Sequence, residues 1–198
     1  MATSAFLVAS VMAILQAGGD VYAPRPDQVV IGEYRRTGAG FVCSVKAAND
    51  QEALRKTKNY CLHYGPLAIG LPRREAERLL GKPLDTVQDA KGKGFVYPRA
   101  WSDATHDRRL LSYVVVVFDL KGLAKAIQVS GDADSSDWRF SSVRLGDPSS
   151  SIVAALGNPF ETSLVSKNGA EFWQYSPWKF SFEVKDRTVT SIRLDAES

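Results

Sequence analysis

The segments GLPRREAERLLGKP at residues 70–83 and GDPSSSIVAALGNP at residues 146–159 share one pattern, which decides our interpretation of the fold. Their matched positions lie 76 residues apart, at Gly70 and Gly146, Pro72 and Pro148, Gly81 and Gly157, and Pro83 and Pro159. In each segment a proline begins a helical turn, apolar residues follow on one face, and a glycine and a second proline end the helix. The pattern predicts a short helix in each segment, within a unit that occurs twice. Asp147 is placed to cap the second helix.

Strand-like stretches follow both predicted helices. Alternating apolar residues and turn signals predict three strands after the second helix and two after the first. These strands are Glu171–Ser176, Trp178–Val184, Val189–Leu194, Leu111–Leu120 and Ala124–Val129. Matching strand residues of the two units lie fewer than 76 positions apart, whereas the predicted helices lie 76 positions apart. The first unit is therefore expected to carry extra residues between its helix and its strands, at the polar segment Pro98–Arg109. The acidic segment Gly131–Asp137 is the expected linker between the units.

Further elements are predicted before the first unit. They are strands at Val29–Tyr34 and Gly40–Lys46 and a helix at Gln51–Tyr64. We therefore divide the chain into a signal peptide (1–17), an N-terminal strand and helix region (18–65), a first unit (66–130) and a second unit (138–195). The expected fold is α+β, with two tandem units that each pack short helices on one face of an antiparallel sheet.

The N-terminal residues and the cysteines point to export. The apolar run Ala5–Leu15 is too short to cross a bilayer and is typical of a signal peptide, with cleavage after Ala17; a buried N-terminal helix is the alternative. Cys43 and Cys61 are predicted to form a disulfide, which stabilises the fold by about 3 kcal/mol on the chain-entropy model; free buried thiols are the alternative. We expect a periplasmic or secreted protein without an integral membrane span.

Composition excludes several classes of function. With 198 residues, 44% hydrophobic and 24% charged, the chain is an ordinary globular protein. Its net charge of +3 and the lack of any block of five like charges argue against nucleic acid as a partner. Two histidines and two cysteines leave few residues for metal or nucleophile chemistry. We expect no cofactor, no metal and no catalytic residue.

Three local patterns resemble sites but have simpler interpretations. Ser102, Asp103, His106 and Asp107 are residue types of a hydrolytic triad, yet they lie in one polar segment without a G-x-S-x-G elbow, which favours a surface loop. The acidic linker lacks the glycine and glutamate of an EF-hand loop, so a solvated linker is favoured over a calcium site. The run Gly92-Lys93-Gly94 does not complete a phosphate-binding motif and is interpreted as a turn.

The repeated pattern resembles the SmpA/OmlA superfamily. This superfamily includes BamE-type outer-membrane assembly lipoproteins and, as a tandem duplication, the secreted β-lactamase inhibitor protein. The resemblance spans about residues 66–195 and is carried by Gly70, Pro72, Leu80, Gly81, Pro83, Gly146, Pro148, Leu156, Gly157, Pro159, Trp173, Tyr175, Phe180, Phe182, Val189 and Ile192. It implies a unit of helices on an antiparallel sheet that serves as a protein-binding surface without catalysis.

Aromatic residues are concentrated in the last predicted strands. Strand alternation places Trp173 and Tyr175 on one face of their strand, and Trp178, Phe180 and Phe182 on one face of the next. These rings form either part of the core or an exposed recognition surface, since Trp and Tyr are common interface anchors. We expect at least one of Trp173, Tyr175 and Trp178 to be exposed.

The sequence thus predicts an exported, non-catalytic module, an envelope-assembly factor or an inhibitor, that binds another protein through an aromatic sheet face. The predicted partner-binding residues are Trp173, Tyr175, Trp178 and Phe180. Two alternatives are a small-molecule or lipid carrier with an apolar pocket and, less favoured, a hydrolase.

Overall fold

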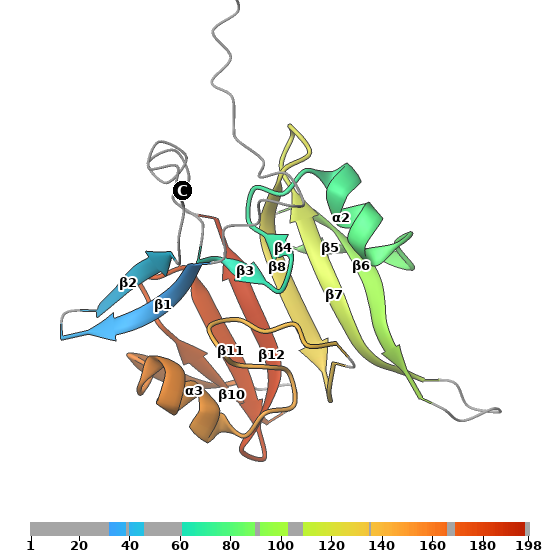
Figure 1. Ribbon diagram of the computed structural model, residues 1–198. Coiled ribbons are helices and arrows are strands. Elements are labelled where there is room, and N and C mark those ends of the chain that lie inside the picture. The colour runs from blue at the N-terminus through green and yellow to red at the C-terminus, as the bar shows by residue number, and fades with distance from the viewer. Residues whose placement is uncertain are drawn as a thin grey trace, which may run out of the picture.

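The computed structural model describes residues 32–38, 40–45, 61–89, 92–102, 109–134, 136–165 and 169–196 (Figure 1). Within these ranges the chain forms twelve strands and two helices. In chain order they are β1 (Gly32–Thr37), β2 (Gly40–Val45), β3 (His63–Tyr64), β4 (Leu67–Ala68), α2 (Arg73–Leu80), β5 (Asp85–Asp89), β6 (Gly92–Trp101), β7 (Leu110–Phe118), β8 (Ala124–Gly131), α3 (Ser149–Leu156), β9 (Glu161–Val165), β10 (Ala170–Gln174), β11 (Phe180–Lys185) and β12 (Thr188–Asp195).

Eight strands form one antiparallel sheet in the order β5-β6-β7-β8-β12-β11-β10-β9. The same element order occurs twice along the chain, because α2 is followed by the meander β5–β8 and α3 by the meander β9–β12. The two meanders meet where β8 pairs with β12, from Ser130 opposite Ser191 to Ala126 opposite Asp195. The hairpins β1–β2 and β3–β4 form separate two-stranded sheets.

The elements outside the large sheet pack on one of its faces, here called the covered face. Figure 1 shows α3, β1–β2 and β3–β4 lying over this face. Each contributes to a single apolar core with the sheet: Ile152 and Leu156 come from α3, Phe41 from β2, and Tyr64 from β3. Phe140, Val143 and Leu145, from the segment between β8 and α3, complete the cover. The opposite face of the sheet is called the open face.

The predicted α+β fold class is wrong, because the protein is mainly β. Each helix has eight residues, and together they bury only Ala76, Ile152 and Leu156. The cover over the sheet is built largely from hairpins and the segment 138–148, in place of the helix layer that we expected. Strands β5, β6 and β9 were also absent from the sequence interpretation, and they widen the sheet to eight strands.

The two Gly-x-Pro segments do form helices, as predicted. Pro72 and Pro148 precede them with nearly equal φ values of −61° and −63°, and Gly81 and Gly157 end them at positive φ. The expected cap by Asp147 is not made. Its carboxylate instead accepts a hydrogen bond of 2.8 Å from the Arg144 N–H, which stabilises the turn before the helix.

The hairpin β1–β2 is fixed to the second half of the sheet. Phe41 is buried edge-on against Tyr175, Trp178 and Phe180, with centroids 5.1–5.7 Å apart. The Arg36 guanidinium donates hydrogen bonds to the carbonyls of Leu156 (3.1 Å) and Asn158 (2.9 Å) at the end of α3. The Leu156 carbonyl lies at the end of the helix and lacks a helical partner, so Arg36 satisfies an acceptor that the helix end leaves free.

The predicted disulfide between Cys43 and Cys61 is confirmed, with Cα atoms 5.7 Å apart. It joins β2 to the residues just before β3. The two N-terminal strands also form where expected, within three residues at each end. The predicted signal peptide (1–17) and residues 51–60 of the predicted helix lie outside the described residues. Tyr64, at the end of that predicted helix, lies in strand β3.

Substituting Phe41→Ala should lower the free energy of unfolding by about 3 kcal/mol or more, because it removes a buried ring from the core. The measurement is urea unfolding followed by far-ultraviolet circular dichroism. The control is Val42→Ala, at the next position of β2, where the side chain is 55% exposed and little burial is lost. Equal effects of the two substitutions would contradict the packing of β1–β2 on the sheet.

Candidate functional site

Two of the four predicted partner-binding residues lie in the core. Tyr175 and Phe180 are buried, and their rings stack on each other with centroids 5.0 Å apart. The Tyr175 hydroxyl donates a 2.7 Å hydrogen bond to the Gly157 carbonyl, and burial raises the pKa of this phenol. The expectation that Tyr175 and Phe180 form a surface is therefore corrected: both rings point into the covered face, beneath β1–β2.

The other two predicted residues, Trp173 and Trp178, are half-buried and pack against the core. The Trp178 ring stacks on Phe160 with centroids 5.5 Å apart. The Trp173 indole N–H donates a 2.8 Å hydrogen bond to Glu171. Trp173 stands opposite Phe182 and so shares the covered face. The aromatic group thus builds the core of the second half and leaves no fully exposed tryptophan or tyrosine among the three expected.

Alternation along the same strands identifies the side chains of the open face. Phe172 and Gln174 flank Trp173 on β10 and so point away from the core. On β7, Tyr113 and Val115 alternate with the buried Val114. The open face thus has an aliphatic and aromatic region on the first half of the sheet, and a polar region around Phe172 on the second half.

A polar network occupies the centre of the open face, where β8 meets β12. Arg193 donates a 3.0 Å hydrogen bond to the Gln128 side-chain oxygen, and its Nε lies 3.3 Å from an Asp195 carboxylate oxygen. The Gln128 amide donates to Ser130 and Ser191, whose hydroxyls are 3.0 Å apart. These hydrogen bonds fix the orientation of the half-buried Arg193 side chain before any ligand binds.

Two surface hollows lie beside this network. The smaller, of about 330 Å³, lies on the open face, and the larger, of about 840 Å³, also reaches Trp178 and Phe180, just before and at the start of β11. Phe172, Ser181 and Arg193 line both hollows. Glu183 adds a carboxylate to the smaller one, and Lys125 adds an ammonium group to the larger one. The Phe172 ring and the Arg193 guanidinium group therefore stand between the two hollows, and the linings of the hollows include both a carboxylate and an ammonium group.

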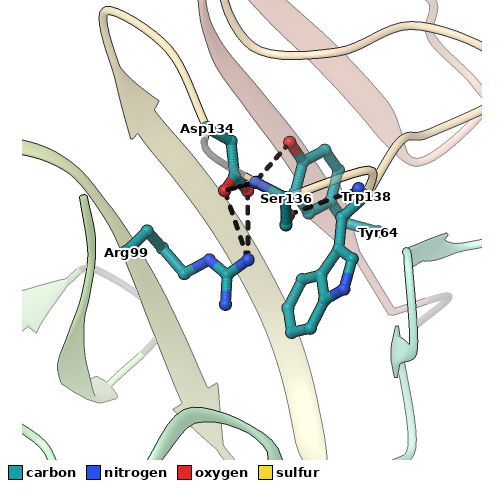
Figure 2. Close-up of polar contacts among 5 residues, drawn as sticks. All are labelled: Tyr64, Arg99, Asp134, Ser136 and Trp138. Carbon is teal, nitrogen blue, oxygen red and sulfur yellow. Dashed lines mark hydrogen bonds and ion pairs between the residues drawn. The ribbon is translucent and has the colours of Figure 1, made fainter.

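A second polar cluster lies where β3, β6 and the linker meet (Figure 2). The Asp134 carboxylate, 2% exposed, lies 3.2 Å from the Arg99 guanidinium, which is 12% exposed. It also accepts hydrogen bonds from the Tyr64 hydroxyl (3.3 Å) and the Ser136 N–H (3.0 Å). The guanidinium stacks on the Trp138 ring, 3.8 Å from its centroid. The interpretation of this linker as wholly solvated is therefore wrong at Asp134.

The cluster around Asp134 holds the chain where it passes from the first meander to the second. Burial and the nearby Asp134 charge both raise the pKa of Tyr64, so the phenol stays protonated and donates its hydrogen bond. Trp138 also lies against Gly65, where an added Cβ would overlap the indole ring. Because the ion pair is buried and faces the core, we assign it to the fold and not to a ligand.

The other residues that the sequence suggested as catalytic or metal-binding candidates add no further site among the described residues. Asp103, His106 and Asp107 of the triad-like group lie outside the described residues. Among the residues that the structure describes, no group of three or more His, Cys, Asp or Glu side chains could hold a metal ion. The ring nitrogens of His63 lie 2.8 Å and 3.0 Å from the Gly32 and Gly65 carbonyl oxygens, which act as hydrogen-bond acceptors, and this indicates a structural role. Neither described helix is long and apolar enough to cross a membrane.

The open-face residues Phe172, Arg193 and Gln128 were missed by the sequence interpretation. A signal for Phe172 was present, because it alternates with Trp173 in the same predicted strand. The prediction named Trp173 and Trp178 instead, and both of these side chains pack against the core. No local signal marks Gln128 and Arg193, because they meet through the β8–β12 pairing across 65 positions of sequence.

No family model and no curated protein matches this chain. One solved structure that is similar to it is a DUF4309 family protein, YjgB, from Bacillus subtilis subsp. subtilis str. 168. The TM-score is 0.43 with 13% sequence identity, over 64% of this chain and 79% of that chain.

Substituting Asp134→Ala should lower the free energy of unfolding by about 3 to 5 kcal/mol, because it leaves the Arg99 charge buried without its partner. Thermal and urea unfolding measure the change. The matched control is Asp137→Ala, three residues further along the linker, where the carboxylate is 90% exposed and pairs with Arg144. The control should change stability by less than about 1 kcal/mol. A small effect at Asp134 would show that the linker is not fixed by this ion pair.

Proposed function

We propose that this protein is an exported, non-catalytic module that binds a protein partner with the open face of its eight-stranded sheet. One observation carries the proposal: every helix and hairpin in the described structure packs on the covered face, and this leaves the opposite face of the sheet accessible. A face of this width is suited to a globular partner, whose surface can cover many strands at once.

The chemistry of the open face supports a protein as the ligand. Phe172 and Arg193 belong to residue types that are enriched at protein interfaces, and they stand between the two hollows. The Arg193 side chain is already held by Gln128 and Asp195, so binding costs little of its conformational entropy. The hydroxyl and amide groups beside it are donors and acceptors for partner side chains that enter the hollows.

We also retain, as a proposal, the resemblance to the SmpA/OmlA superfamily and the division into tandem units at 66–130 and 138–195. The recurrence of one helix followed by a four-stranded meander supports both. The proposed unit is mainly β, with one short helix followed by four strands. Identification of the partner will show whether this module inhibits an enzyme or acts in envelope assembly.

Export is supported by the disulfide between Cys43 and Cys61, because such bonds form and persist in oxidising compartments. A periplasmic or secreted location is part of the proposal.

The function is tested with the mature protein immobilised as bait for proteins from the native host's envelope and secreted fractions. A specific partner should bind the wild-type protein. Substituting Phe172→Ala or Arg193→Ala should weaken the isolated complex by about 2 kcal/mol, about 30-fold in Kd. Isothermal titration calorimetry measures the affinity.

The control is Val153→Ala on α3, an exposed apolar residue on the covered side of the molecule, which should leave the affinity unchanged. Unfolding curves of all three variants check that lost binding does not arise from lost folding. If Val153→Ala weakens the complex and the two open-face substitutions do not, the proposed binding face is wrong.

A further inference from the structure

Strand β9 forms one edge of the large sheet and has few of the features that usually protect such edges. Its sequence, ETSLV, contains no proline and no lysine, its one charged residue is Glu161 at its start, and its register with β10 is continuous over all five residues. Four of its side chains are exposed, and Leu164 is 77% exposed. An edge of this kind offers unpaired backbone donors and acceptors to another strand.

The region next to this edge is also apolar. Phe160, immediately before β9, is 49% exposed, and Val153 on α3 is 38% exposed. Register with β10 places Leu164 on the covered side of the sheet, opposite Glu171, while Ser163 lies on the open side, opposite Phe172. A strand added at β9 would bring its own side chains beside Leu164 and would reduce the exposed apolar surface.

Charge distinguishes the possible strand partners within a second copy of this chain. The opposite edge, β5, carries Asp85 and Asp89 at its two ends. Centred antiparallel pairing of β5 with a second β5 places Asp85 opposite Asp89, and pairing of β5 with β9 places Asp89 opposite Glu161. Like charges directly opposite each other destabilise a strand pair. Centred antiparallel pairing of β9 with a second β9 places Glu161 opposite Val165 and Thr162 opposite Leu164, so no like charges oppose.

We propose that two copies of this protein associate through β9, antiparallel and centred on Ser163, to form one continuous sixteen-stranded sheet. The two-fold axis of such a pair runs perpendicular to the sheet, because it reverses strand direction and keeps the faces on their own sides. Both open faces then lie on the same side of the dimer. The proposal is independent of the partner-binding role, since it concerns the edge of the sheet and not its open face.

The test uses the position that meets itself at the two-fold axis. Ser163→Asp and Ser163→Lys each place two like charges opposite each other in the dimer, and each should raise the dimer dissociation constant at least about tenfold. Mixing the two variants should restore association as a one-to-one heterodimer, because the charges are then opposite. Sedimentation velocity of the mature wild-type chain, at about 1 μM to about 1 mM, measures the reference dissociation constant.

The control is Val87→Asp, at the centre of the other edge strand, which should leave the dimer intact. Unfolding curves confirm that each variant is folded. A wild-type protein that stays monomeric over the whole range overturns the proposal and leaves the edge to an extended segment of another protein. A dimer that Val87→Asp disrupts, or that neither single Ser163 variant weakens, overturns it as well. Failure of the mixed variants to associate also counts against it.

Discussion

The antiparallel pairing of β8 with β12 is the constraint on which the remaining structure depends. It joins two meanders, formed by residues far apart in sequence, into one sheet and aligns their apolar residues on the same face. Ile127 and Val129 then lie opposite Leu194 and Ile192, and all four are fully or almost fully buried in one core. The same pairing brings Gln128 beside Arg193 on the other face. Core and candidate binding face are thus two consequences of a single register.

Some of this structure could be predicted because the signals are local. Glycine and proline at fixed spacing identify α2 and α3, since helix starts and ends depend on neighbouring residues alone. Alternation over Leu111–Leu120 and Val189–Leu194 identifies β7 and β12 for the same reason. The disulfide followed from having two cysteines in a chain with a signal-like N-terminus. None of these signals reports how much of the sheet the helices cover, and the fold class was therefore misjudged.

The residues that were misjudged depend on contacts distant in sequence. Gly92 and Gly94 suggested a turn, but both lie in β6, where a Cβ at Gly94 would approach a Val115 methyl group to 2.7 Å. Strand β9 has only five residues and three of them are polar, so its sequence shows no clear alternation of apolar and polar side chains. Asp134 resembled its solvated neighbours because its partner Arg99 lies 35 positions earlier. Each error reflects tertiary packing that overrides the local pattern.

The most direct test of this account is a disulfide across the β8–β12 pairing. Ser130 and Ser191 are paired in register, and their hydroxyl oxygens lie 3.0 Å apart. The double variant Ser130→Cys, Ser191→Cys should therefore form a second disulfide in the folded protein, seen by thiol titration and peptide mapping. Ser130→Cys with Ser181→Cys is the control, since β12 separates those strands and both thiols should stay free. Two free thiols in the first variant, once folded, would contradict the shared sheet and its single open face.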